Sequence, residues 1–278
     1  MRRKQERIFN LPPVVFWIVA LLAAIEGLSQ LVTPEAYLEI LRRFAFVPAR
    51  FTFAFAPDRV SRALASVAED AELRAQAAAF FLGDGKPLWW TPLTYAFLHG
   101  GWLHVGMNCL WFAAFGSAVA RRFGAPRFLF FCAAAAIAGA AMHYVTHMTD
   151  LQPVVGASAA VSGVMAAAVR FVFQPGAPLG ESLGFAERAD EGMAYRQPAL
   201  PLREILSNRG AISFLFFWFL ANFLFGAIPA PLGVTDATVA WEAHIGGFLI
   251  GLLAFRWFDP PAPPVAIPPS NRRAAPAD

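Results

Sequence analysis

Six long apolar runs alternate with polar segments along this chain. They cover Leu11–Val32, Trp102–Ala120, Phe128–His147, Gly156–Phe173, Ala211–Ile228 and Val239–Phe258. Each is close to the roughly 20 residues that an α-helix needs to cross the hydrocarbon core of a bilayer. Because backbone inside lipid must satisfy its own hydrogen bonds, we expect each run to be a helix. The pattern predicts an all-α, polytopic membrane protein, a bundle of six transmembrane helices.

The composition agrees with this class. The chain has 278 residues, 58% apolar and only 15% charged, whereas soluble domains average about 25% charged residues. No run mixes basic and aromatic residues in the manner of a nucleic-acid-binding segment. Cys109 and Cys132 both lie in apolar runs and form neither a disulfide framework nor a metal-binding spacing. We therefore expect the lipid bilayer as a partner, no nucleic acid, and cysteines that serve packing.

Basic residues predict the orientation, because short loops rich in Arg and Lys stay in the cytoplasm. The organisation expected is a cytoplasmic N-terminus (1–10), a membrane domain (11–258) and a disordered, Pro-rich cytoplasmic tail (259–278). Within the membrane domain, 33–101 forms a long outer loop and 174–210 a cytoplasmic loop. Both termini are then cytoplasmic. The richness in Ala, Pro and Arg suggests a bacterial cytoplasmic (inner) membrane.

The first apolar run and the long outer loop each allow more than one interpretation. The basic start followed by the apolar run 11–32 also fits a cleavable signal peptide, but no small-x-small site ends the run, which favours a retained span. The outer loop is mixed in character. Val60–Phe81 has an amphipathic, helical pattern, and the pair Trp89 and Trp90 suits a membrane interface. We expect this loop to be partly embedded.

Polar side chains from three separate runs fall at one depth. Ser158 begins the fourth run, His244 lies about five residues into the sixth, and His104 and Asn108 lie in the first two turns of the second. At about 1.5 Å rise per residue, all are within roughly 10 Å of the predicted outer ends. His104 and Asn108 are four residues apart and share a helix face. Packing serines and histidines need not coincide in this way.

These residue types suit acyl transfer. A serine hydroxyl becomes a nucleophile when a base takes its proton, and an imidazole such as that of His244 titrates near neutral pH. The oxyanion that forms needs donors, which His104, Asn108 and the Ser158 backbone N–H could supply. Gly156 leaves space beside the serine, and Gly247 with Gly251 forms a GxxxG pattern that permits close helix contact. No carboxylate is placed to orient His244, so we expect a Ser–His dyad that requires no cofactor or metal.

Other interpretations of the same residues are weaker. Ser158 alone would more often be a packing residue, and an α/β-hydrolase elbow needs a preceding strand and a glycine where Ala160 stands. His143 and His147 are four residues apart and could bind a metal, but the sequence shows no third ligand, which favours interfacial histidines. A transporter or channel would place polar residues at mid-membrane, whereas these stop at the outer third.

The chain resembles the rhomboid family of intramembrane serine proteases over roughly residues 88–257. The resemblance rests on His99-Gly-Gly-Trp-Leu-His104-Val-Gly-Met-Asn108, on Gly156-Ala157-Ser158 and on Ala243-His244-Ile-Gly-Gly247. It implies that Ser158 is the nucleophile, His244 the base, and His104 and Asn108 the oxyanion donors. It further implies that the substrates are transmembrane proteins cleaved near the outer face. His99 is expected to order its loop.

The sequence departs from the family pattern near the serine. Ala159 stands where the family commonly has glycine, Ser162 where it often has an aromatic ring against the histidine, and Thr91 follows Trp90 in place of arginine. Ser162 could hydrogen-bond His244 in place of that ring. The same departures support an alternative function, a catalytically inactive rhomboid-like protein that binds or escorts membrane proteins.

Overall fold

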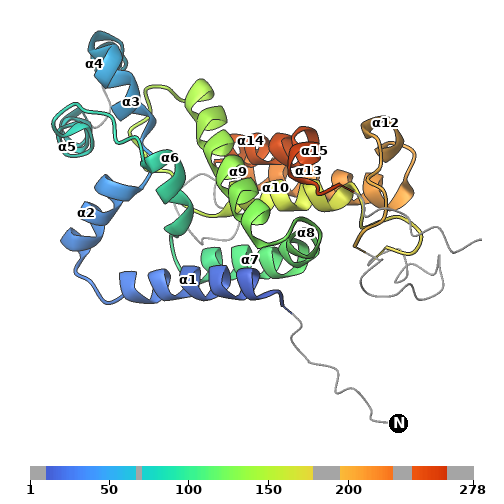
Figure 1. Cartoon of the computed structure of the whole chain (residues 1–278). Coiled ribbons are helices and arrows are strands. Elements are labelled where there is room, and N and C mark those ends of the chain that lie inside the picture. The colour runs from blue at the N-terminus through green and yellow to red at the C-terminus, as the bar shows by residue number, and fades with distance from the viewer. Residues whose placement is uncertain (1–10, 67–70, 178–194, 228–239, 262–278) are drawn as a thin grey trace, which may run out of the picture.

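The computed structural model shows an all-helical protein (Figure 1). It describes residues 11–66, 71–177, 195–227 and 240–261. Within those ranges no strand occurs, and the only β-type pairing is an isolated bridge between Phe46 and Val154. The predicted all-α fold is confirmed. The basic N-terminus, residues 178–194 of the cytoplasmic loop, the outer turn 229–238 and the tail from 262 lie outside the described residues.

Apolar helices occupy all six predicted runs. They are α1 (Pro13–Ser29), α7 (Trp102–Trp111) continuing through η2 (Phe112–Gly116) into α8 (Ser117–Phe123), α9 (Ala125–Thr146), α10 (Ser158–Val169), α13 (Arg209–Ala227) and α14 (Trp241–Leu253). By length and composition alone, two described helices could cross a membrane, Trp102–Phe123 and Ala125–Thr146. The other four described apolar helices are shorter.

Local sequence accounts for several helix boundaries. Pro13 and Pro126 stand in the first turns of α1 and α9, where a missing N–H costs nothing. Gly124 has φ +76° and is the single residue between α8 and α9, so the chain reverses there at a position that favours glycine. The turn between the second and third apolar runs is therefore very short. Arg121 and Arg122 belong to α8, and Arg127 belongs to α9.

Helix α10 lies at the centre of the bundle, and all its residues after Ser158 are buried. It packs against α9 and α14, and small residues make this possible. A Cβ on Gly247 would overlap the Ala159 carbonyl, and one on Gly251 would overlap the Gly163 carbonyl. The predicted GxxxG contact is confirmed, with the fourth run as its partner.

The segment between α1 and α7 forms a cluster of short helices at one end of the bundle (Figure 1). They are α2 (Pro34–Phe44), α3 (Pro48–Phe55), α4 (Pro57–Ala65), α5 (Ala71–Leu82), α6 (Thr91–Thr94) and η1 (Tyr95–Phe97). A helical pattern was predicted over Val60–Phe81, and the described part of this range lies mostly in two helices, α4 and α5. Both fold back on α3, since Val60 and Ala78 pack around Ala49.

Arg50 holds this cluster of short helices together. Its guanidinium donates to the Phe81 and Lys86 carbonyls at 3.1 and 2.8 Å and pairs with Asp84 at 3.0 Å. The Lys86 backbone N–H, together with the Arg50 charge, keeps the pKa of Asp84 below its usual value. The segment is thus a folded cluster of helices connected by side-chain contacts, and not an extended loop.

A second buried arginine holds the other end of the bundle, where α12 (Leu202–Ile205) lies (Figure 1). Arg122 pairs with both carboxylate oxygens of Asp259 at 2.7 and 2.9 Å and donates to the Tyr195 and Gln197 carbonyls. Its guanidinium also lies over the Phe171 ring. Asp259, the first residue of the predicted tail, is therefore held by this contact.

Candidate functional site

Ser158 is the first residue of α10 and is half-buried. Its position depends on Gly156, which has φ +121°, a conformation that side chains rarely adopt. A Cβ at Gly156 would also lie 2.7 Å from Nε2 of His104. Gly156 is fixed from behind, because its N–H donates to the Tyr95 carbonyl at 3.0 Å. Glycine is thus required here for two independent reasons, conformation and space.

His104 and Asn108 lie on one face of α7, as predicted. The Gly100 N–H donates to Nδ1 of His104 at 3.3 Å, so in the neutral imidazole the proton is on Nε2. Nε2 is the atom that lies against Gly156, next to the serine. Asn108 is buried, and one of its amide N–H groups donates to the His104 carbonyl at 3.1 Å. Its second amide N–H remains available as a donor. His104 therefore presents a donor beside Gly156, and Asn108 keeps a free donor one turn further along the same face.

His244 lies in the first turn of α14 and has the opposite tautomer. Its Nδ1 lies 2.5 Å from Oδ1 of Asn222 on α13. The Asn222 amide nitrogen donates to the Trp218 carbonyl at 2.8 Å, which identifies the oxygen as the atom facing the imidazole. His244 therefore donates through Nδ1 and keeps a lone pair on Nε2. An Nε2 lone pair is what a general base needs.

Close helix packing brings these groups together. The Ala159 carbonyl, one residue past Ser158, touches Gly247, which is three residues past His244. The Ala159 methyl group and the Ala243 carbonyl, which comes directly before His244, both lie against Gly139 of α9. Segments far apart in the sequence therefore converge at the start of α10.

His99 orders the loop before α7, as predicted. Its Nε2 accepts a hydrogen bond from the Ala157 N–H at 3.3 Å, and its ring meets that of His104 edge-on, with centroids 5.0 Å apart. The Tyr37 hydroxyl donates to the His99 carbonyl at 3.1 Å. His99 thus connects the cluster of short helices to the residue that precedes the serine.

Two predicted details have different structural outcomes. Ser162 is buried on α10, and the hydrogen bond that His244 makes goes to Asn222 instead. Ala159, where the family commonly has glycine, fits because Gly139 of α9 faces its methyl group. The sequence alone did not identify a partner for Asn222, a lone amide in a Phe-rich helix. Its only signal was its polarity in an apolar run.

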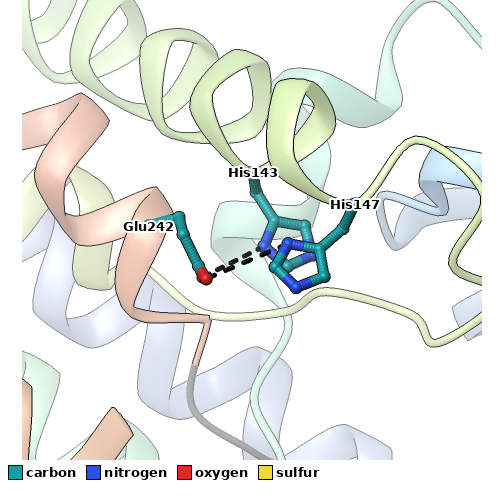
Figure 2. A group of neighbouring side chains, drawn as sticks. All are labelled: His143, His147 and Glu242. Atoms are coloured by element: carbon teal, nitrogen blue, oxygen red, sulfur yellow. Dashed lines mark ion pairs between the residues drawn. The ribbon is translucent and has the colours of Figure 1, made fainter.

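A second group of polar side chains lies where the end of α9 meets the start of α14 (Figure 2). It consists of His143 in α9, His147 directly after α9 and Glu242 in α14, and one ligand atom from each lies within 4.8 Å of the others. The histidine pair lacked a third ligand in the sequence. The structure supplies Glu242, which is distant along the chain. The three residues could hold a metal ion.

Comparison with known protein families matches a Rhomboid domain over residues 86–187 and 191–258. No curated protein matches the chain. The matched regions cover more than half of the chain and contain α6 to α10 and α12 to α15. These regions include Ser158, His104, Asn108, Asn222 and His244. The chain therefore belongs to the rhomboid family and is a polytopic helical membrane protein.

Proposed function

We propose that this protein is an intramembrane serine endopeptidase that hydrolyses a peptide bond of transmembrane substrates near the outer membrane face. One observation carries the proposal. His104 and His244 are held as opposite tautomers, the first with a proton on Nε2 and the second with a lone pair there. An oxyanion donor and a general base need these two states, respectively. Histidines that serve only packing would not need one particular tautomer each.

Proton transfer begins the reaction. Nε2 of His244 takes the Ser158 proton while Oγ attacks the substrate carbonyl, which forms a tetrahedral oxyanion. The Asn222 oxygen accepts a hydrogen bond from Nδ1–H of His244 throughout the reaction. The ring therefore keeps its orientation when it becomes a cation. The amide thereby takes the place of the aromatic ring that the family often has at position 162.

The oxyanion is stabilised by three donors, Nε2–H of His104, the second amide N–H of Asn108 and the Ser158 backbone N–H. Loss of one such donor typically costs about 10²–10³ in rate. The Ser158 N–H is also at the N-terminus of α10, where the helix dipole favours negative charge. The protonated His244 then gives its proton to the leaving amine. In the second half, His244 takes a proton from a water molecule, the water attacks the acyl carbonyl, and the Ser158 oxygen leaves and regains its proton from His244.

Substrate access is proposed through α13. Four of its aromatic rings, those of Phe216, Phe217, Phe219 and Phe223, are exposed, while Trp218 stacks on Phe248 of α14 with centroids 4.3 Å apart. The exposed rings suit contact with lipid or with a transmembrane substrate. Because Asn222 is on the same helix, movement of α13 to admit a substrate would also move the partner of His244.

The test is cleavage of a transmembrane substrate by the full chain reconstituted in liposomes. Ser158→Ala and His244→Ala should each lower the cleavage rate by more than about 10³-fold, since nucleophile and base act as one unit. A fluorophosphonate probe should label the wild-type protein and leave Ser158→Ala unlabelled. Cleavage by Ser158→Ala at the wild-type rate would show that another group does the chemistry.

The alternative is an inactive relative that binds or escorts membrane proteins. The absence of both cleavage and probe labelling in a well-folded wild-type protein would favour it. Ser162→Ala is the matched control for Ser158→Ala, because both serines are on α10 and only Ser158 is placed in the catalytic machinery. Probe labelling should survive Ser162→Ala.

A further inference from the structure

We propose that His143, His147 and Glu242 form a zinc site that clamps the end of α9 to the start of α14. The site shares no residue with the proposed catalytic machinery and does not depend on the proposed protease activity. His143 lies in the last turn of α9 and His147 directly follows that helix, and Glu242 faces them from the first turn of α14 (Figure 2). Two histidines and one glutamate are a known ligand set for Zn²⁺, with a fourth position left for water.

The spacing of the ligands fits an ion better than it fits hydrogen bonds. Nδ1 of His143 lies 3.6 Å from one Glu242 oxygen, and Nδ1 of His147 lies 3.9 Å from the other. Both distances exceed hydrogen-bond length. Tetrahedral Zn²⁺ with bonds of about 2.0–2.1 Å separates its ligands by about 3.3 Å. Small side-chain rotations would therefore close the three groups around an ion.

A buried nitrogen without a hydrogen-bond partner is the second, independent observation. His143 is only 5% exposed, and among the described residues its Nδ1 has no hydrogen-bond partner. Burying a polar atom unpaired is costly, so such atoms normally have a ligand or an ordered partner. In this structure the atom faces the Glu242 carboxylate (Figure 2).

The arrangement of the rings and charges also favours a cation. The two imidazoles stack nearly parallel, 10° apart with centroids at 4.6 Å, an arrangement that two protonated rings would resist. Among the described residues, Glu242 forms ion pairs with these two histidines alone. The Thr146 hydroxyl lies 2.9 Å from Nδ1 of His147 and would give up this contact when that nitrogen binds the ion. One Zn²⁺ would bind the carboxylate and both neutral rings.

Metal binding to the purified, tag-free full chain in detergent tests this proposal. After removal of metal with a chelator, calorimetric titration with Zn²⁺ should give one site per chain, and Co²⁺ should produce the absorption bands of a tetrahedral ion. Glu242→Gln and His147→Ala should each weaken Zn²⁺ binding more than about tenfold, because even loss of an outer-shell partner costs that much. No Zn²⁺ binding by the wild type, or wild-type affinity in both variants, would overturn the site.

His104→Ala is the matched control, because it removes a histidine from the other histidine pair, His99 and His104. It should bind Zn²⁺ as the wild type does, and loss of binding in this variant would assign the metal to that other pair. Folding is checked by thermal unfolding. Zn²⁺ should raise the unfolding midpoint of the wild type and of His104→Ala and leave that of Glu242→Gln unchanged. Glu242→Gln is isosteric, and its midpoint in chelator should match the wild type.

Discussion

The amide of Asn222 is the residue on which the proposed chemistry most depends after the serine and its base. It accepts from Nδ1 of His244 and is itself fixed by the Trp218 carbonyl, so both the tautomer and the ring orientation follow from one side chain. Serine proteases commonly assign this task to a carboxylate. An amide is neutral, and within a low-dielectric bundle it costs less to bury than a charge.

Substitution of Asn222 should therefore slow the reaction without weakening substrate binding. Asn222→Leu, similar in volume but without an acceptor, should lower kcat by about 10–100-fold, since a hydrogen bond to a group that becomes charged contributes about 1.5–3 kcal/mol. KM should change little. Asn222→Asp keeps an oxygen acceptor and should recover much of the rate. Equal kcat in wild type and Asn222→Leu would remove Asn222 from the mechanism.

At the scale of helices, the contact between α10 and α14 determines whether the site exists. It brings backbone against backbone, with Gly247 on the Ala159 carbonyl and Gly251 on the Gly163 carbonyl. A methyl group at either glycine would meet main-chain atoms, which cannot move aside as a side chain can. The helices would have to separate, and His244 would move away from Ser158.

Gly251→Ala should consequently destabilise the protein by about 2 kcal/mol, as overpacking typically costs 1–3 kcal/mol. The matched control is Gly106→Ala on α7, where a Cβ meets nothing within 4 Å. That change should be neutral or stabilising by up to about 1 kcal/mol, because alanine favours helix. Thermal unfolding in detergent measures both. A Gly251→Ala protein as stable as Gly106→Ala would contradict the packing described here.

At the scale of the molecule, two buried arginines brace opposite ends of the helix bundle. Arg50 organises the short helices between α1 and α7, and Arg122 joins α8 to Asp259 and to residues 195–197. Each guanidinium uses several donors on backbone carbonyls as well as on a carboxylate, so burial of the charge is compensated. The bundle is thereby held at both ends while its centre packs through small residues.

Asp259→Asn should test the brace at the α8 end. It leaves Arg122 buried without its bidentate partner and should lower the free energy of unfolding by about 2 kcal/mol. Glu204→Gln is the matched control, because it removes a carboxylate from the exposed pair with Arg203, in which the arginine is 85% exposed. This change should stay within about 0.5 kcal/mol of wild type. Equal unfolding midpoints for the two variants would show that Arg122 does not need Asp259.

Much of this molecule is determined by the sequence alone. Long apolar runs in lipid can satisfy their backbone only as helices, which is why the six runs were predicted and found as helices. The family followed from three motifs in order, and Gly156, Gly247 and Gly251 were identifiable because close approach requires glycine. His104, Asn108, Ser158 and His244 were placed at one depth by counting residues.

Tertiary structure decided the partnerships between distant segments. Asn222 meets His244 across α13 and α14, and Glu242 meets the α9 histidines, because helix rotation and crossing set which faces touch. Periodicity gives each helix a face but not the neighbour of that face. The separate helices α4 and α5 likewise follow from packing on α3. The helices and the residue types of the candidate site were therefore predictable from the sequence. The contacts between side chains of different helices required the tertiary structure.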